Sequence, residues 1–175
     1  MRLLMVLLLS LMMTACGSVD IQDYRDTQPR LVLEQFFQGA LTASGVVQDF
    51  SGKVVRRFNV SMQASWQGSQ LTLDEDFVYD DGEIQKRVWV IDALGEGQYL
   101  GRAGDILGAA QGQAVGSALR WQYDMLLAVD GSQYQVSFDD WMFLVNDHTI
   151  INRSDINKFG ITVAQVTLVI QKTPR

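Results

Sequence analysis

Over much of the chain, apolar residues alternate with polar ones, and this pattern limits the possible folds more than any other feature. Between Val54 and Trp66 every second position is apolar except Arg56, and the positions between them are mostly polar. A repeat of two residues places the apolar side chains on one face of a β-strand. Such a strand must bury that face against other strands, so the sequence predicts an all-β fold.

Turn residues join these alternating segments at the places where hairpins are expected. Gly68-Ser69 separates two of the segments, and Asp130-Gly131 separates two others. Two-residue turns of this composition connect antiparallel neighbours and fix their register. The expected pairs are Trp66 with Leu71 and Val60 with Phe77 in the first hairpin, and Met125 with Val136 and Tyr123 with Phe138 in the second.

About nine short antiparallel strands follow from the whole pattern, with no helix long enough to cross over a parallel sheet. A short helix is expected between Arg30 and Gly39, where Leu33, Phe36 and Phe37 share one side and can plug the end of a barrel. A lipocalin-like up-and-down β-barrel is the first choice, because closure removes exposed strand edges. There are two alternatives. One is a half-barrel that holds a helix, and the other is a β-sandwich. The glycine-rich segment 104–116 fits either a rim loop or a strand.

The chain begins with Met1-Arg2 and an apolar run from Leu3 to Met13. At about 1.5 Å per residue this run covers about 17 Å, which is short of the roughly 30 Å hydrocarbon core of a membrane. A basic start, a short apolar run and small residues after it are typical of a signal that is removed. The sequence therefore predicts a signal peptide over residues 1–15.

The end of this segment, Met13-Thr14-Ala15-Cys16, resembles the bacterial lipobox. The resemblance implies that Cys16 is lipidated and becomes the first residue of the mature chain, although a secretory signal with a chance cysteine is the alternative. Two or more acyl chains anchor a protein stably. Lipoproteins that stay in the inner membrane carry Asp directly after the lipidated cysteine, and this chain has Gly17 at that position. We therefore expect an outer-membrane anchor with the protein facing the periplasm. Residues 16–29 are predicted to be a flexible tether, and residues 30–175 a single barrel domain.

The negative charge of the chain argues against partners that are themselves negatively charged. The sequence has 20 Asp and Glu against 14 Lys and Arg, and its formal net charge is −6. Such a surface repels phosphate backbones and anionic headgroups. We therefore expect no nucleic acid partner and a membrane attachment that is covalent.

No set of residues in the sequence predicts catalysis. His148 is the only histidine and follows Asp147, but adjacent residues in a turn do not bring a nucleophile, a base and an orienting group to one point. Structural zinc needs more Cys and His than the chain has. The acidic run Asp74 to Asp76 alternates across strand faces, unlike a calcium loop. We expect no enzyme activity, no metal and no cofactor.

Two charged residues, Arg56 and Glu75, fall on apolar strand faces. An unpaired buried charge is costly, so a partner or water must lie nearby. Arg87 is a candidate partner of Glu75. A two-residue Asp81-Gly82 loop would turn Arg87 outward, whereas one bulged residue would place Arg87 and Trp89 inside with Glu75. A polar patch for a ligand headgroup and a structural ion pair near the barrel mouth both remain open.

Several short motifs suggest a family. The chain carries Asp139-Asp140-Trp141-Met142, Asn152-Arg153-Ser154, Lys158-Phe159-Gly160, and Glu75-Asp76-Phe77 with Asp81-Gly82. Together they resemble a domain-of-unknown-function family of proteobacterial lipoproteins, and the likeness spans the whole mature domain. The resemblance implies a compartment and a shared fold, and supplies no catalytic residues.

These observations predict an outer-membrane lipoprotein whose barrel holds a lipid or another apolar or amphipathic ligand. The alternative is a structural or protein-interaction component of the cell envelope that has a packed barrel and no small-molecule ligand. The volume of the interior distinguishes the two. The candidate ligand-binding residues are Trp66, Glu75, Arg87, Trp89, Trp121, Tyr123 and Phe138.

Overall fold

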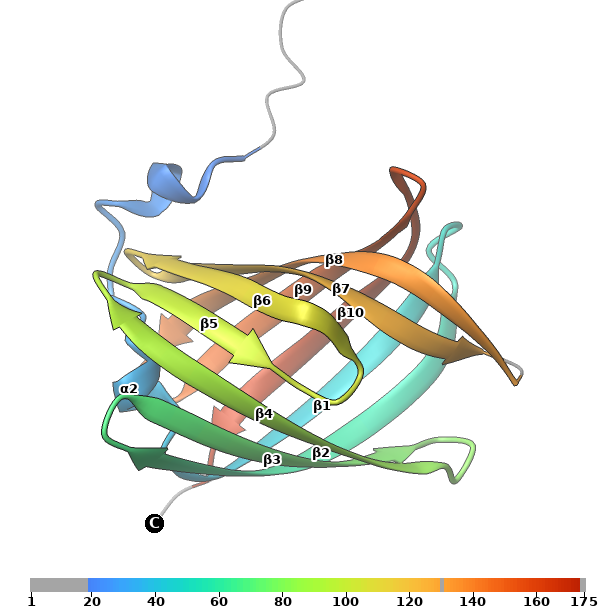
Figure 1. The fold of residues 1–175 in the computed structure, drawn as a ribbon, viewed down its shortest axis with the longest axis horizontal. Helices are drawn as coiled ribbons and strands as arrows, with labels where there is room; N and C mark the ends of the chain where they lie inside the picture. The colour runs from blue at the N-terminus through green and yellow to red at the C-terminus, as the bar shows by residue number, and fades with distance from the viewer. Residues whose placement is uncertain (1–18, 130, 174–175) are drawn as a thin grey trace, which may run out of the picture.

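The computed structural model describes residues 19–129 and 131–173, which form a closed barrel of ten antiparallel strands (Figure 1). Each strand pairs with the next one in the chain, and β10 also pairs with β1, which closes the sheet. The predicted all-β up-and-down barrel is confirmed, with one strand more than the expected nine. The strands are β1 (Gly39–Asp49), β2 (Val54–Gln67), β3 (Gln70–Tyr79), β4 (Ile84–Gly95), β5 (Gln98–Arg102), β6 (Ile106–Val115), β7 (Ala118–Val129), β8 (Ser132–Asn146), β9 (Thr149–Lys158) and β10 (Ile161–Lys172).

The two hairpins predicted from turn chemistry have the expected registers. Trp66 lies opposite Leu71 across β2 and β3. Tyr123 lies opposite Phe138 across β7 and β8. Asp130 of the second turn lies outside the described residues. In both hairpins the apolar side chains of one face point into the barrel, because a strand turns alternate side chains to opposite faces.

The turn between β3 and β4 decides which residues enter the barrel. Glu75 lies opposite Arg87, and Leu73 lies opposite Trp89. With this register the turn between β3 and β4 is one residue longer than a two-residue Asp81-Gly82 loop. Gly82 in this turn has a φ of 87°. The bulged alternative is therefore confirmed, and Arg87 and Trp89 lie on the inner face with Glu75.

The glycine-rich segment 104–116 contains strand β6, which was not among the nine strands expected from the sequence. Its pairing with β7 shifts between Leu107 and Gln111, and Gly108 in this bulge has a φ of 76°. Gly112 lies opposite Trp121, and a Cβ at Gly112 would come within 2.6 Å of the indole ring. Of the two structures expected for this segment, a rim loop or a strand, the strand is confirmed. Gly112 leaves room for the large inward side chain of Trp121.

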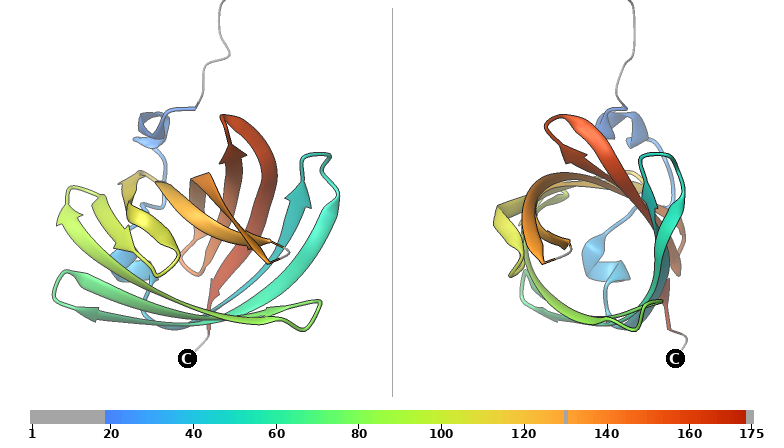
Figure 2. Two further views of the ribbon diagram at one scale, coloured as in Figure 1. Left: turned by 45° about the vertical axis from the view of Figure 1, so that its right-hand side comes forward. Right: turned by 90° about the vertical axis from the view of Figure 1, so that its right-hand side faces the viewer.

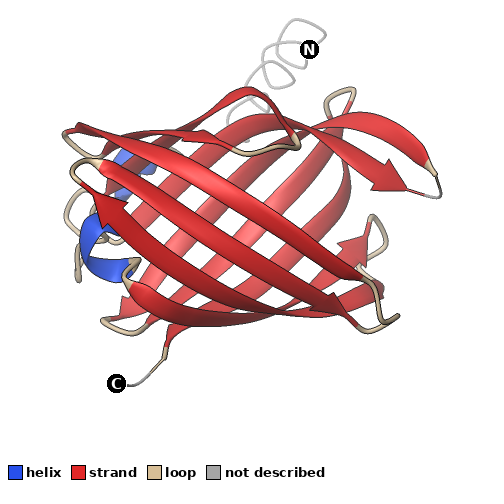
Figure 3. Ribbon diagram, turned by 60° about the horizontal axis from the view of Figure 1, so that its bottom comes forward, coloured by secondary structure: helices blue, strands red, loops and turns tan. Residues whose placement is uncertain are grey.

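One end of the barrel is plugged by the short helical turn α2 (Leu33–Phe36), as expected from its apolar side (Figure 2). Leu33 is fully buried and Phe36 is 3% exposed. Three side-chain hydrogen bonds tie the plug to the wall: Trp66 Nε1 donates to Phe37 O at 2.8 Å, Tyr99 Oη donates to Glu34 Oε2 at 2.9 Å, and Lys172 Nζ donates to Gln35 O at 3.1 Å. Figure 3 places this turn at one end of the obliquely running strands.

The segment before the plug packs on the outside of the barrel. It contains the 3-10 turn η1 (Ile21–Tyr24), and the Tyr24 ring lies 5.8 Å from the ring of Trp141. Thr27 Oγ1 accepts a hydrogen bond of 2.9 Å from the backbone N–H of Ser117. Contacts of Tyr24 and Thr27 therefore hold this segment, which lies within the expected tether, against the barrel wall.

The predicted signal peptide and Cys16 lie outside the described residues. Within residues 19–129 and 131–173, no helix has the length and apolar character needed to cross a membrane.

The close approach of Gly112 to Trp121 predicts a destabilised variant. Gly112→Ala adds a Cβ that collides with the indole ring, and overpacking of this kind costs about 1–3 kcal/mol. We expect the free energy of unfolding, measured with urea, to fall by that amount. The matched control is Gly104→Ala, whose new Cβ would meet no atom within 4 Å. Equal stability of the two variants would contradict this account of β6.

Candidate ligand-binding cavity

A cavity of about 1120 Å³ occupies the interior of the barrel. Leu33 and Phe37 of the plug line its closed end, and Asp49, Asp81 and Gln133 line it near the strand ends on the opposite side. The view along the barrel shows the ring of strands with α2 at its far end (Figure 2). Small-molecule pockets commonly measure about 300–1,000 Å³, so this interior has room for a ligand of substantial size.

Six of the seven residues expected to bind a ligand line this cavity. They are Glu75, Arg87, Trp89, Trp121, Tyr123 and Phe138. The seventh, Trp66, lies at the plugged end, where its indole N–H bonds to the Phe37 carbonyl, and it is not among the residues that border the cavity. Trp66 therefore holds the plug in place.

Aromatic rings cover a large part of the cavity wall. The rings of Tyr123 and Phe138 are stacked, with centroids 5.0 Å apart and planes 8° apart. Trp89 meets Tyr123 edge to face at 5.6 Å and lies 6.4 Å from Trp121. These contacts join β4, β7 and β8 into one apolar surface that can receive a hydrocarbon or an aromatic body.

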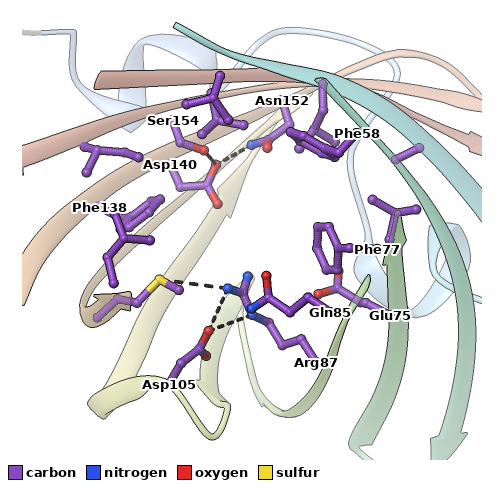
Figure 4. Close-up of a pocket in the computed structure, with 18 of the residues that line it drawn as sticks. Phe58, Glu75, Phe77, Gln85, Arg87, Asp105, Phe138, Asp140, Asn152 and Ser154 are labelled. Carbon is purple, nitrogen blue, oxygen red and sulfur yellow. Dashed lines mark hydrogen bonds and ion pairs between the residues drawn. The ribbon is translucent and has the colours of Figure 1, made fainter. Parts of the chain in front are cut away.

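Arg87 is held inside the barrel by Asp105, which lies in the turn between β5 and β6. Its Nη2 and Nε donate to Asp105 Oδ2 at 2.6 and 3.0 Å (Figure 4). Burial acts to lower the pKa of the Arg87 guanidinium, but the charges of Asp105 and Glu75 outweigh it and the pKa is raised. The expected pairing of Arg87 with Glu75 is therefore only half correct: the two face each other in the ladder, but the direct hydrogen bonds go to Asp105.

A second polar group lies on β8 and β9. Asp140 Oδ1 accepts hydrogen bonds from Asn152 Nδ2 and from Ser154 Oγ, the latter at 2.8 Å. All three side chains are at least 93% buried. Figure 4 shows the other oxygen of Asp140 directed toward the space that Arg87 and Phe138 border. This carboxyl group is therefore positioned by two donors and faces the cavity.

Burial changes the acidity of both inner carboxyl groups. It raises the pKa of Glu75 to about 7, although the charge of Arg87 acts in the opposite direction. It raises the pKa of Asp140 to about 6 against the hydrogen bonds from Asn152 and Ser154. Desolvation disfavours the charged form of an acid, so these groups exchange protons near neutral pH.

Two carboxylate oxygens in this region are buried without a hydrogen-bond partner among the described residues. They are Glu75 Oε2 and Asp105 Oδ1. A buried polar atom without a partner costs about 1–3 kcal/mol. Such atoms are uncommon in folded proteins, and here they belong to residues that line a large cavity.

A separate ion-pair group lies at the open end. Arg56 bonds to Asp81 at 2.9 Å and to Glu83 at 2.6 Å, and its guanidinium lies 3.5 Å from the centre of the Tyr79 ring. The expected inward direction of Arg56 is correct, but its partners are turn residues at the mouth. Arg56 does not contribute to the inner group around Glu75.

Sequence reasoning missed Asp105, Asp140, Asn152 and Ser154. Three of them carried a signal: the register predicted for β7 and β8 places Asp140 opposite Trp121, and Asn152 and Ser154 share the inward parity of Ile150. Asp105 carried none, because it lies in a turn. Asp140, Asn152, Ser154 and Glu75 all belong to the motifs that suggested the family.

Other candidate chemistry is not assembled by the fold. His148 is exposed in the turn between β8 and β9. Within the part of the chain that the structure describes, no group of three or more His, Cys, Asp or Glu is placed to hold a metal ion.

Comparison with known proteins places the chain in a family. The family model described as "Protein of unknown function (DUF3833)" matches residues 10–172, and the chain belongs to this family. No curated protein is significantly similar in sequence.

Solved structures share the fold. Rv2717c from M. tuberculosis is similar with a TM-score of 0.60 and 12% identity, over 85% of this chain and 100% of that one. The S-type phycobiliprotein lyase CPES from Guillardia theta is similar with a TM-score of 0.58 and 8% identity, over 83% and 96% of the two chains. At these identities the likeness shows the barrel fold alone.

The raised pKa of Glu75 predicts how the stability of the protein depends on pH. The folded state binds the proton more tightly than the unfolded chain does, so the stability from this group is complete below about pH 4.5 and is lost as pH rises through about 7. Glu75→Gln keeps the shape of the side chain and cannot ionise. We expect the variant to exceed the unchanged protein in free energy of unfolding by about 1–3 kcal/mol at pH 8, and by much less at pH 5.

Urea unfolding at a series of pH values between 5 and 8 measures this difference. The control is Asp76→Asn, which removes the neighbouring exposed carboxylate on the outer face of β3 and leaves the buried Glu75 in place. Parallel stability curves for Glu75→Gln and the unchanged protein would rule out a raised pKa at this position.

Proposed function

We propose that this protein binds an apolar or amphipathic small molecule inside its barrel. The observation that carries the proposal is the cavity of about 1120 Å³, since a barrel with a purely structural role would fill its interior with side chains. The wall is mostly apolar and aromatic, and a few polar groups lie within it. This combination is typical of small-molecule sites.

The shape of the cavity supports binding from one side. The plug residues Leu33 and Phe37 close one end, so a ligand enters between the hairpin turns at the other end. The likeness in fold to a phycobiliprotein lyase is compatible with this proposal. We further propose that the cavity holds its ligand without catalysing a reaction. The Ser154 hydroxyl is bonded to Asp140, but among the described residues no histidine or lysine lines the cavity to activate it.

Tryptophan fluorescence tests the proposal. Trp89 lines the cavity, whereas Trp141 lies against Tyr24 on the outside. We expect titration of the purified protein with long-chain alcohols, amines, fatty acids and phospholipids to change the emission for at least one class. The larger part of that change disappears in Trp89→Phe and persists in Trp141→Phe. Absence of any saturable change across the panel would refute the proposal.

We also propose that the mature protein is anchored in the outer membrane, facing the periplasm, through lipid on Cys16. The support is the lipobox-like sequence from Met13 to Cys16. A chain with two or three acyl groups stays in a bilayer, while a chain with none is held only by its surface.

Substitution of the cysteine tests this anchor. We expect Cys16→Ala to move the protein from the membrane fraction of its host to the soluble fraction, or to leave it uncleaved with its signal segment attached. Mass spectrometry of the unchanged protein should find diacylglyceryl and acyl groups on residue 16. A free thiol there in the native host would disprove lipidation.

A second candidate function, contact with another envelope component, is favoured by apolar side chains at the open end. Phe50, Ile84 and Phe159 lie in or next to the hairpin turns there and are 85%, 74% and 94% exposed. Phe159 also has a φ of 52°, which is uncommon for an aromatic residue. Crosslinking in intact cells separates the two functions, because a constant protein partner together with an empty cavity supports the second.

A further inference from the structure

Acidic side chains outnumber basic ones in the lining of the cavity. Among the described residues, six carboxyl groups and two guanidinium groups border it, and no lysine does. Both guanidinium groups are already engaged: Arg56 with Asp81 and Glu83 at the mouth, and Arg87 with Asp105 inside. The inner carboxyl groups of Glu75 and Asp140 are therefore left without a cation of their own.

The geometry of these two groups leaves acceptor positions free. Both hydrogen bonds to Asp140 end on Oδ1, and the other oxygen points into the cavity (Figure 4). Glu75 Oε2 is buried and receives no hydrogen bond from any residue that the structure describes. The site thus offers acceptors in excess of donors, in an enclosed space where charge is weakly screened.

We propose that the ligand is an amphiphile whose polar group is a hydrogen-bond-donating cation, such as a protonated amine, and that Asp140 and Glu75 receive this group. The inference rests on the proposed function and adds the chemical class of the ligand. The ammonium donates to the free oxygen of Asp140, and the charge of Glu75 in the same cavity adds to the attraction. The apolar body lies along the aromatic wall.

Two further features fit a cation. The stacked rings of Tyr123 and Phe138 present aromatic faces next to Asp140, and such faces attract ammonium groups. Near the mouth, Asp49, Asp81 and Glu83 outnumber Arg56 among the residues that line the cavity, with Lys53 close to Asp49. An excess of carboxylates at an entrance concentrates cations.

An anionic headgroup fits the same site poorly. A fatty-acid carboxylate would meet Asp140 and Glu75, while the charge of Arg87 is already compensated by Asp105. In the empty cavity protons fill the role of the missing cation, which agrees with the raised pKa values of Asp140 and Glu75. Binding of an ammonium group would replace those protons.

Three probes with the same hydrocarbon chain test the inference: dodecylamine, dodecanol and dodecanoate, each titrated below its micelle concentration at pH 8 with Trp89 fluorescence as the readout. We expect the amine to bind about tenfold or more tightly than the carboxylate, since one partly shielded charge pair is worth about 1.4 kcal/mol. We expect dodecanol to lie between them. Native mass spectrometry should give one amine per chain.

Substitutions assign the preference to the inner carboxyl groups. Asp140→Asn and Glu75→Gln should each lower the ratio of amine to carboxylate affinity severalfold and leave dodecanol binding nearly unchanged. Asp76→Asn, on the outer face, should leave the ratio unchanged, which excludes adsorption to the acidic surface.

The possible outcomes are distinct. Equal affinity for all three probes, or tighter binding of the carboxylate, would overturn the inference and leave the proposed function standing. A preference for the amine that survives both inner substitutions would also overturn it. Failure of every probe to bind would count against the proposed function as well.

Discussion

The pairing of β1 with β10 is the constraint on which the rest of the structure depends. It joins the ends of a ten-stranded meander, so each described strand pairs with a neighbour on both sides over at least part of its length. Barrel diameter grows with the number of strands, and about eight strands already give an interior that side chains can fill. A closed sheet of ten strands is wider, and the inward side chains leave a cavity of about 1120 Å³.

The plug shields one end of this wide barrel from water. A wide barrel exposes its apolar interior to water at both ends, and the turn Leu33–Phe36 covers one of them with buried apolar side chains. Hydrogen bonds from Trp66, Tyr99 and Lys172 hold the plug against three separate strands. The interior is therefore closed by the plug at one end.

The polar groups inside the barrel are the least expected part of the structure. Burying carboxyl groups is costly unless they are paired, protonated or hydrogen-bonded. Arg87 and Asp105 pair with each other, and Asp140 has two neutral donors. Glu75 keeps an oxygen that has no hydrogen-bond partner within residues 19–129 and 131–173. An interior selected only for stability would hold apolar side chains at these positions, so the arrangement points to recognition of a polar group.

The sequence by itself determined most of the strands, two of the registers and most of the inward faces, because alternation and turn chemistry are local properties. It left strand β6 undecided. It left the facing of Arg87 open, since one bulged residue reverses it. Only the tertiary structure decided that the interior is hollow and that Asp105, Asp140 and Glu75 line the same cavity. Those residues are far apart in the chain, and the distance across a barrel is set by the number and tilt of all its strands together, which no local pattern encodes.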